Sequence, residues 1–206
     1  MTTSRHLPLL ALCILIATGV SARADVKSGL SLMYQGDYAS ALQELEASAK
    51  TGDVQAEYWL GHMYEQGLGV NPDAAQAVTW WTKATQGGLV QAKQALGVLY
   101  LQGEGVFQDF AKARMWLEDA ADDADAVARR ELGTLYAEGL GVNKDNIWAY
   151  VWYDFAARGY DREAAKLRGD LLKTMSTGDI EEAQKLAAKI APTVFGAESG
   201  PDQEKQ

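Results

Sequence analysis

Three stretches of eleven residues recur along this chain at a fixed distance. LGHMYEQGLGV begins at Leu60, LGVLYLQGEGV at Leu96 and LGTLYAEGLGV at Leu132, each 36 residues after the one before. A catalytic loop is needed once, whereas a stretch repeated at a period of about 20 to 50 residues marks a structural unit that stacks on its neighbours. The sequence therefore predicts a repeat protein in which each unit buries its apolar face against the next.

The first half of each unit has the pattern of an amphipathic helix. Ala56, Leu60 and Tyr64 are four residues apart and lie on one stripe of a helix, and the same residue types recur in the other two units. A glycine follows each leucine, although glycine costs a helix about 1 kcal/mol relative to alanine. We infer that a neighbouring helix approaches these glycines too closely for a Cβ atom. They are Gly61, Gly97 and Gly133.

A loop of the form Gly-x-Gly-Val and a second helix follow in each unit. The first glycine of the loop supplies the left-handed C-cap, and the second turns the chain back. Asn71-Pro72 is then predicted to be the N-cap and first residue of the second helix, with Asp73 in its first turn. The predicted buried stripe of this helix is an alanine, a tryptophan and an alanine in each unit. Its members are Ala77, Trp80 and Ala84, then Ala113, Trp116 and Ala120, then Ala149, Trp152 and Ala156.

The whole pattern, A-x3-LG-x2-Y-x2-G-x-GV, then D, then A-x2-W-x3-A and a closing turn, closely resembles the Sel-one-like repeat, a branch of the tetratricopeptide-type helical repeats. The resemblance implies an all-α fold, a right-handed α-solenoid of about five antiparallel helix pairs, in a single domain over residues 25–192. Its concave face would be lined mainly by the first helix of each unit. The three units are 53–88, 89–124 and 125–160, flanked by a degenerate unit at 26–51, a capping helical hairpin at 161–192 and a tail at 193–206 that we expect to be disordered.

The first 24 residues have the features of a secretory signal peptide. Arg5 precedes an apolar stretch from Leu9 to Val20, and Ala22-Arg23-Ala24 has the small-x-small form of a cleavage site, so we expect cleavage after Ala24. The alternative is an uncleaved anchor, but the apolar run is short for a span that needs about 20 residues. We therefore expect a periplasmic or secreted protein with no stable membrane insertion after cleavage.

Cleavage would also remove the single cysteine, Cys13, and would leave a mature chain without thiols or disulfides. Loss of Arg5 and Arg23 leaves 17 basic against 28 acidic residues, a net charge of −11. A charge of this sign repels the phosphates of nucleic acids and anionic lipid head groups, so we expect neither as the main partner.

The residues that could carry chemistry are few, and we expect no catalytic site, no cofactor and no metal. His62 would be the only histidine of the mature chain, and its equivalents are Val98 and Thr134, so the position varies between units. A histidine metal site or a Ser-His-Asp triad would have to include it. A group of aspartates is best explained by helix capping and a solvated face, with weak divalent binding as an alternative. This group comprises Asp119, Asp122, Asp123 and Asp125.

Positions that the repeat pattern leaves free are where a partner could be recognised. On the first helices these candidate partner-binding residues are Tyr58, His62 and Glu65, Gln94, Val98 and Leu101, and Arg130 and Thr134, followed by Ala137. Relatives of the resembled family include periplasmic regulators of sensor kinases, flagellar motor components and secretion scaffolds. The resemblance thus implies a non-enzymatic protein–protein interaction adaptor or regulator, here a monomer that binds an envelope protein or peptide.

Two other functions are weighed against this one. A cell-wall or glycan binder could use the aromatic residues that depart from the repeat pattern, which are Tyr58, Trp59, Trp81, Trp148, Tyr150 and Tyr153. A weak β-lactamase-like hydrolase is suggested by secreted, cysteine-rich members of the resembled family. The present chain lacks the cysteine pairs that mark that group.

Overall fold

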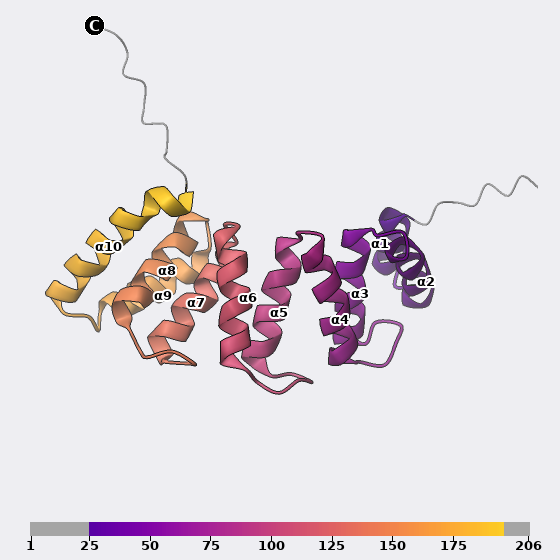
Figure 1. Ribbon diagram of the computed structural model, residues 1–206, viewed down its shortest axis with the longest axis horizontal. Coiled ribbons are helices and arrows are strands. Elements are labelled where there is room, and N and C mark those ends of the chain that lie inside the picture. Colours follow the sequence, from indigo (N-terminus) through magenta and orange to yellow (C-terminus); the bar gives the residue numbers. More distant parts are fainter. Residues whose placement is uncertain (1–24, 196–206) are drawn as a thin grey trace, which may run out of the picture.

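The computed structural model describes residues 25–195, and within this range the chain forms ten α-helices and no β-strand (Figure 1). The helices follow one another along the long axis of the molecule, which confirms the predicted all-α solenoid (Figure 1). In chain order they are α1 (Val26–Tyr34), α2 (Tyr38–Ala49), α3 (Val54–Gln66), α4 (Ala74–Gln86), α5 (Val90–Gln102), α6 (Phe110–Asp122), α7 (Ala126–Glu138), α8 (Asn146–Arg158), α9 (Arg162–Leu172) and α10 (Thr177–Phe195). The predicted signal peptide lies outside the described residues, as do residues 196–206 of the predicted tail.

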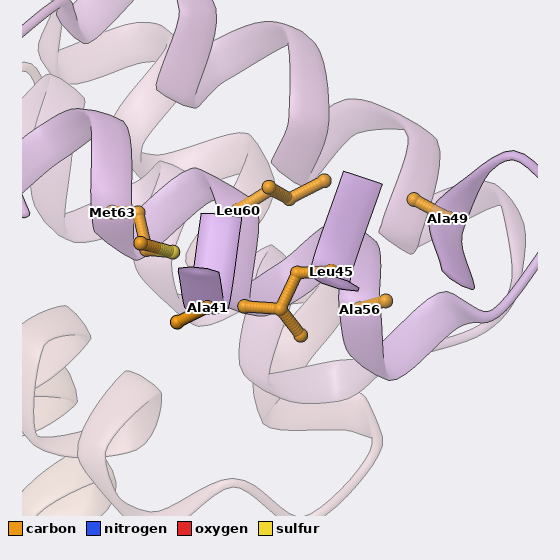
Figure 2. Packing of buried hydrophobic residues seen from close by; sticks show 6 residues of the cluster. All are labelled: Ala41, Leu45, Ala49, Ala56, Leu60 and Met63. Atoms are coloured by element: carbon orange, nitrogen blue, oxygen red, sulfur yellow. The ribbon is translucent and has the colours of Figure 1, made fainter. Parts of the chain in front are cut away.

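The alanine and leucine of the stripe predicted for the first helices lie in the core between units. The repeated tyrosines of that stripe are only half-buried, and the residue before each of them is buried instead, namely Met63, Leu99 and Leu135. Figure 2 shows one such cluster, in which α2 and α3 pack through small and large apolar side chains that are all buried. The labelled residues are Ala41, Leu45, Ala49, Ala56, Leu60 and Met63. The alternation of alanine with leucine or methionine lets the two helices approach closely while their larger side chains fill the space between.

The glycine after each repeated leucine marks the contact between the two helices of one unit. A Cβ atom added at Gly61 would lie closer than 3.0 Å to the indole of Trp81 on α4. The equivalent glycines meet Leu117 on α6 and Tyr153 on α8 in the same way. The predicted close approach of a neighbouring helix is therefore confirmed.

The predicted burial of the repeated tryptophans is wrong by one residue. Trp80 is half-buried, as are its equivalents in the other two units, whereas the next residue, Trp81, is fully buried. Trp81 faces the glycine of α3, and its Nε1 donates a hydrogen bond to the backbone oxygen of Tyr58 at 3.1 Å. The ring of Trp80 is instead covered by the ammonium of Lys83, 3.9 Å from its centroid.

The Gly-x-Gly-Val loops begin as predicted, but the helix after them starts later. Gly67 has φ 71° and is the left-handed C-cap of α3. The N-cap of α4 is Asp73, whose carboxylate accepts hydrogen bonds from two backbone N–H groups of the first turn, so the prediction of Asn71 as cap and Pro72 as first helical residue is wrong. An aspartate whose carboxylate reaches two amides stabilises the helix start better than the preceding Asn-Pro pair, since capping and the helix dipole act together.

The repeat register continues into α9. Asp161 caps this helix, as Asp53 and Asp125 cap α3 and α7, and Ala164 is fully buried like its equivalent Ala56. Gly169 stands where the other first helices have the contact glycine, but a Cβ atom added there would meet nothing within 4 Å. Helix α9 is therefore the first helix of a further unit that lacks its second helix.

The two C-terminal helices, α9 and α10, each pack mainly against α8, and residues of both helices belong to one apolar cluster with it. The outer face of α8 is apolar, with Trp148, Val151 and Phe155 packed in one cluster. The equivalent residues of α4 are the polar Gln76, Thr79 and Lys83. Helix α10 covers this apolar face through Ala183 and Ala187 and extends beyond residue 192, where the predicted domain ended. No helix within residues 25–195 combines the length and apolarity needed to cross a membrane.

Candidate partner-binding surface

The predicted site residues lie on α3, α5 and α7, the first helices of the three repeats. All eight are half-buried, so each combines an exposed part with a contact inside the solenoid. They are Tyr58, His62 and Glu65 on α3, Gln94, Val98 and Leu101 on α5, and Arg130 and Thr134 on α7.

The three residues on α3 lie together and are joined by Trp59. The ring of Tyr58 meets His62 edge-on with centroids 4.7 Å apart, and the ring of Trp59 lies 5.5 Å from Tyr58 and 5.6 Å from His62. The Nδ1 atom of His62 lies 3.3 Å from a carboxylate oxygen of Glu65. These four side chains form the aromatic-acidic cluster of α3, in which three rings lie beside one carboxylate.

Charges from two helices act on this cluster. The pKa of Tyr58 is raised, mainly because burial disfavours the phenolate, and further by the carboxylates of Glu65 and Asp125. Asp125 caps the start of α7, two first helices further along the solenoid. Carboxylates of two different units therefore contribute to the raised pKa of Tyr58.

The residues on α5 and α7 have structural contacts that limit their freedom. Leu101 packs against the core cluster formed by α6 and α7. Thr134 lies 3.2 Å from the hydroxyl of Tyr153. Arg130 forms ion pairs with Glu131 at 2.7 Å and with Asp161, the N-cap of α9, at 2.9 Å. Arg130 thus links two successive units, a role that its position in the sequence did not reveal.

The acidic group near the end of α6 is also explained by contacts within the chain. The ammonium of Lys93 lies 2.9 Å from Asp119 and 2.8 Å from Asp123, and so connects α5 to the end of α6. Asp125 accepts a hydrogen bond from the backbone N–H of Ala128 at 2.7 Å. Within residues 25–195 no three histidine, cysteine, aspartate or glutamate side chains are grouped to hold a metal ion.

Most of the aromatic residues suggested for glycan binding are not available to a ligand. Trp81, Tyr150 and Tyr153 are buried, at 0%, 7% and 3% exposure. Trp148 stacks with Tyr136 at 6.2 Å and packs beneath α10. Trp81 is explained by its contact with Gly61, and Trp148, Tyr150 and Tyr153 by the packing around α8. The α3 pair of Tyr58 and Trp59 is half-buried.

An apolar pocket at the N-terminal end of the solenoid was missed by the sequence reasoning. It has a volume of about 220 Å³ and is lined by Leu30, Met33, Tyr34, Tyr38, Trp59 and Leu68. Tyr34 is 93% exposed at its rim. The pocket joins residues from α1, α2, α3 and the following loop, which share no sequence spacing, so no local pattern could have indicated it.

Comparison with protein families identifies the repeats. The family model for the Sel1 repeat matches residues 54–89, 90–125 and 126–161. The chain belongs to the Sel1 repeat family. Sel1 repeats generally mediate protein–protein interaction, and proteins built from them are typically non-catalytic scaffolds.

Among solved structures, the chain is similar to a Sel1 repeat protein from Oxalobacter formigenes, with 30% identity and a TM-score of 0.65 over 70% of this chain and 60% of that one. The chain thus spans less than two thirds of that relative's length. A protective antigen of uropathogenic Escherichia coli strains with an SLR fold matches 90% of this chain and 52% of its own, at 23% identity and a TM-score of 0.48. A search of curated proteins gave no match.

Proposed function

We propose that this Sel1 repeat protein is a non-enzymatic periplasmic adaptor or regulator that binds an envelope protein or peptide through its first helices. The signal-peptide features of residues 1–24 support export. The repeats support an interaction role, since stacked helical units create an extended surface whose variable side chains can be changed without loss of the scaffold.

The observation that carries the proposal is the aromatic-acidic cluster of α3. Its side chains lie outside the repeated packing stripe, yet they contact one another over distances of 3.3 to 5.6 Å. Partly exposed tyrosine and tryptophan side chains are the usual hot spots of protein interfaces, because they bury a large area with few rotatable bonds. A surface of this kind suits a protein or peptide partner.

The glycan alternative is less well supported by the arrangement of the aromatic residues. Sugar rings stack on broad, exposed aromatic faces, but Tyr58 and Trp59 meet each other edge-on at 69° and are half-buried. The hydrolase alternative has no particular arrangement of side chains in its favour. The ring of His62 lies among Tyr58, Trp59 and Trp81, with Glu65 at its Nδ1.

The proposal is tested by capture of partners from an envelope extract with the exported protein, followed by affinity measurements on each purified candidate. Tyr58→Ala should weaken direct binding about fivefold or more, as expected for an interface tyrosine. Phe107→Ala is the control, because this side chain is 98% exposed on the loop between α5 and α6, away from α3, and its loss should leave the affinity unchanged.

The thermal midpoint is measured for both variants, so that a loss of folding is not mistaken for a loss of contact. Recovery of glycan fragments alone would refute the proposal. A protein partner that binds equally well to the Tyr58→Ala variant would refute the assignment of its binding to α3.

A further inference from the structure

The apolar pocket at the N-terminal end and the aromatic-acidic cluster of α3 are continuous. Trp59 lines the pocket, and its ring also contacts the rings of Tyr58 and His62. A partner segment that lies over α3 therefore meets an apolar cavity on one side of Trp59 and a carboxylate-flanked tyrosine on the other.

The size of the pocket limits what can occupy it. Pockets for small-molecule ligands have volumes of about 300 to 1,000 Å³, whereas this one measures about 220 Å³. Its six lining residues carry no charged group. The pocket suits one large apolar side chain, held as an anchor, better than a separate small molecule. The exposed ring of Tyr34 at the rim adds contact area for such an anchor.

The charges around Tyr58 favour a cation. On α5 and α7, Lys93 contacts two aspartates and Arg130 contacts Glu131 and an aspartate, while the buried Arg129 interacts with Asp125 and Asp122. The only ion-pair contact of Glu65 in the described part of the chain is with His62.

Among the described residues, two other aromatic rings have a lysine ammonium over one face, whereas the ring of Tyr58 has none. The ammonium of Lys83 lies 3.9 Å from the ring centroid of Trp80, and that of Lys112 lies 5.0 Å from that of Tyr100. Between residues 25 and 195, no lysine or arginine lies over the ring of Tyr58 in this way. A cation placed over the ring of Tyr58 would be attracted both by the ring face and by the nearby carboxylate of Glu65. Burial is the main cause of the raised pKa of Tyr58, and the carboxylates of Glu65 and Asp125 add to it.

We propose that this surface binds a partner segment with a large apolar side chain, seated in the pocket beside Trp59, and a neighbouring lysine or arginine, seated over Tyr58 next to Glu65. The two side chains would be separated by about one to three residues, since alternate residues of an extended segment are about 7 Å apart. This inference rests on the proposed function and specifies the chemistry of its partner.

A displayed library of random peptides of about twelve residues, selected on the whole exported protein, provides the test. The enriched peptides should combine leucine, isoleucine, methionine, phenylalanine or tryptophan with a nearby lysine or arginine. One enriched peptide is then synthesised, together with a matched copy in which its lysine or arginine is replaced by glutamine. Binding of both peptides is measured to the parent protein and to two variants.

The variants separate the two halves of the surface. Tyr34→Ala should weaken both peptides about threefold or more, because it removes the rim of the pocket without opening the core. Glu65→Gln should weaken the basic peptide about threefold or more, reduce its salt dependence, and leave the glutamine copy unchanged. Phe107→Ala should affect neither peptide.

Enriched peptides without a basic residue, or full affinity in both variants, would overturn the inference. Absence of any enrichment would also count against it, because the pocket and the cation position are formed in the free protein. A protein partner that still depends on Tyr58 but not on Tyr34 or Glu65 would leave the proposed function standing and refute this inference alone. The proposed function would itself be refuted if the protein bound its partner equally well whichever side chain of α3 was replaced.

Discussion

Gly61 and Gly169 occupy equivalent positions in two units, and the structure predicts opposite effects when each is replaced by alanine. At Gly61 the new Cβ atom would lie closer than 3.0 Å to the indole of Trp81, which is fully buried. At Gly169 it would meet nothing within 4 Å, because no neighbouring helix within residues 25–195 lies against this position of α9. The same substitution in the same register thus isolates the effect of the neighbouring helix.

The expected magnitudes follow from these contacts. Overpacking against a rigid buried ring costs about 1 to 3 kcal/mol. Displacement of Trp81 also endangers the hydrogen bond of its Nε1 to the Tyr58 carbonyl, and a buried N–H without a partner costs about 1 to 3 kcal/mol. Alanine returns about 1 kcal/mol of helix propensity. Gly61→Ala should therefore destabilise the protein by about 1 to 5 kcal/mol, whereas Gly169→Ala should stabilise it by about 0.5 to 1 kcal/mol.

Urea unfolding followed by far-UV circular dichroism measures both changes, with an unchanged slope as the check that the unfolding transition is the same. A Gly61→Ala variant as stable as the parent would show that the two helices of the unit are not in close contact at this glycine. A Gly169→Ala variant destabilised as much as Gly61→Ala would show that a helix does cover α9.

Four further predictions concern stability and export. Leu96→Ala should cost about 2 to 5 kcal/mol in urea unfolding, because Leu96 is fully buried between units, and a cost under about half a kcal/mol would contradict that placement. Arg130→Ala should cost about 1 to 3 kcal/mol, since it removes the charged hydrogen bonds that join α7 to the N-cap of α9, and a thermal midpoint equal to that of the parent would show that this link is not formed. A backbone N–H of the first turn of α6 lowers the pKa of the Asp109 carboxyl, so its stabilising effect is present above the ordinary carboxyl pKa and is lost as the pH falls through the lowered value. The thermal midpoints of Asp109→Ala and the parent should therefore differ at neutral pH and converge once the pH falls below the lowered pKa. The exported protein should begin at Asp25 by mass spectrometry, and a chain that still contains the apolar stretch would indicate an anchor.

The repeated features of the fold could be predicted from the sequence because they depend on short-range physics. The contact at Gly61, the left-handed cap at Gly67 and the buried pair Ala56 and Leu60 recur at one period and agree with the structure. A glycine with positive φ or without room for a Cβ atom leaves the same signature in every unit. Three copies of one pattern therefore determined the class of fold.

The choice of buried aromatic on the second helices could not be made from spacing alone. Ala77 and Ala84 are seven residues apart, and both Trp80 and Trp81 lie between them on the same side of a helix with 3.6 residues per turn. Only the position of α3, with Gly61 facing α4, decides that Trp81 is buried and Trp80 half-buried.

In the candidate site, too, sequence spacing determined some features and tertiary contacts determined the others. The sequence by itself determined that Tyr58, His62 and Glu65 share one face of a helix, because that follows from their spacing. Tertiary structure decided that Trp59 joins this face to an apolar pocket, that Arg130 is held by the cap of α9, and that α10 covers α8. These contacts join residues from different helices through packing and charge, and such pairings have no period for a sequence pattern to display.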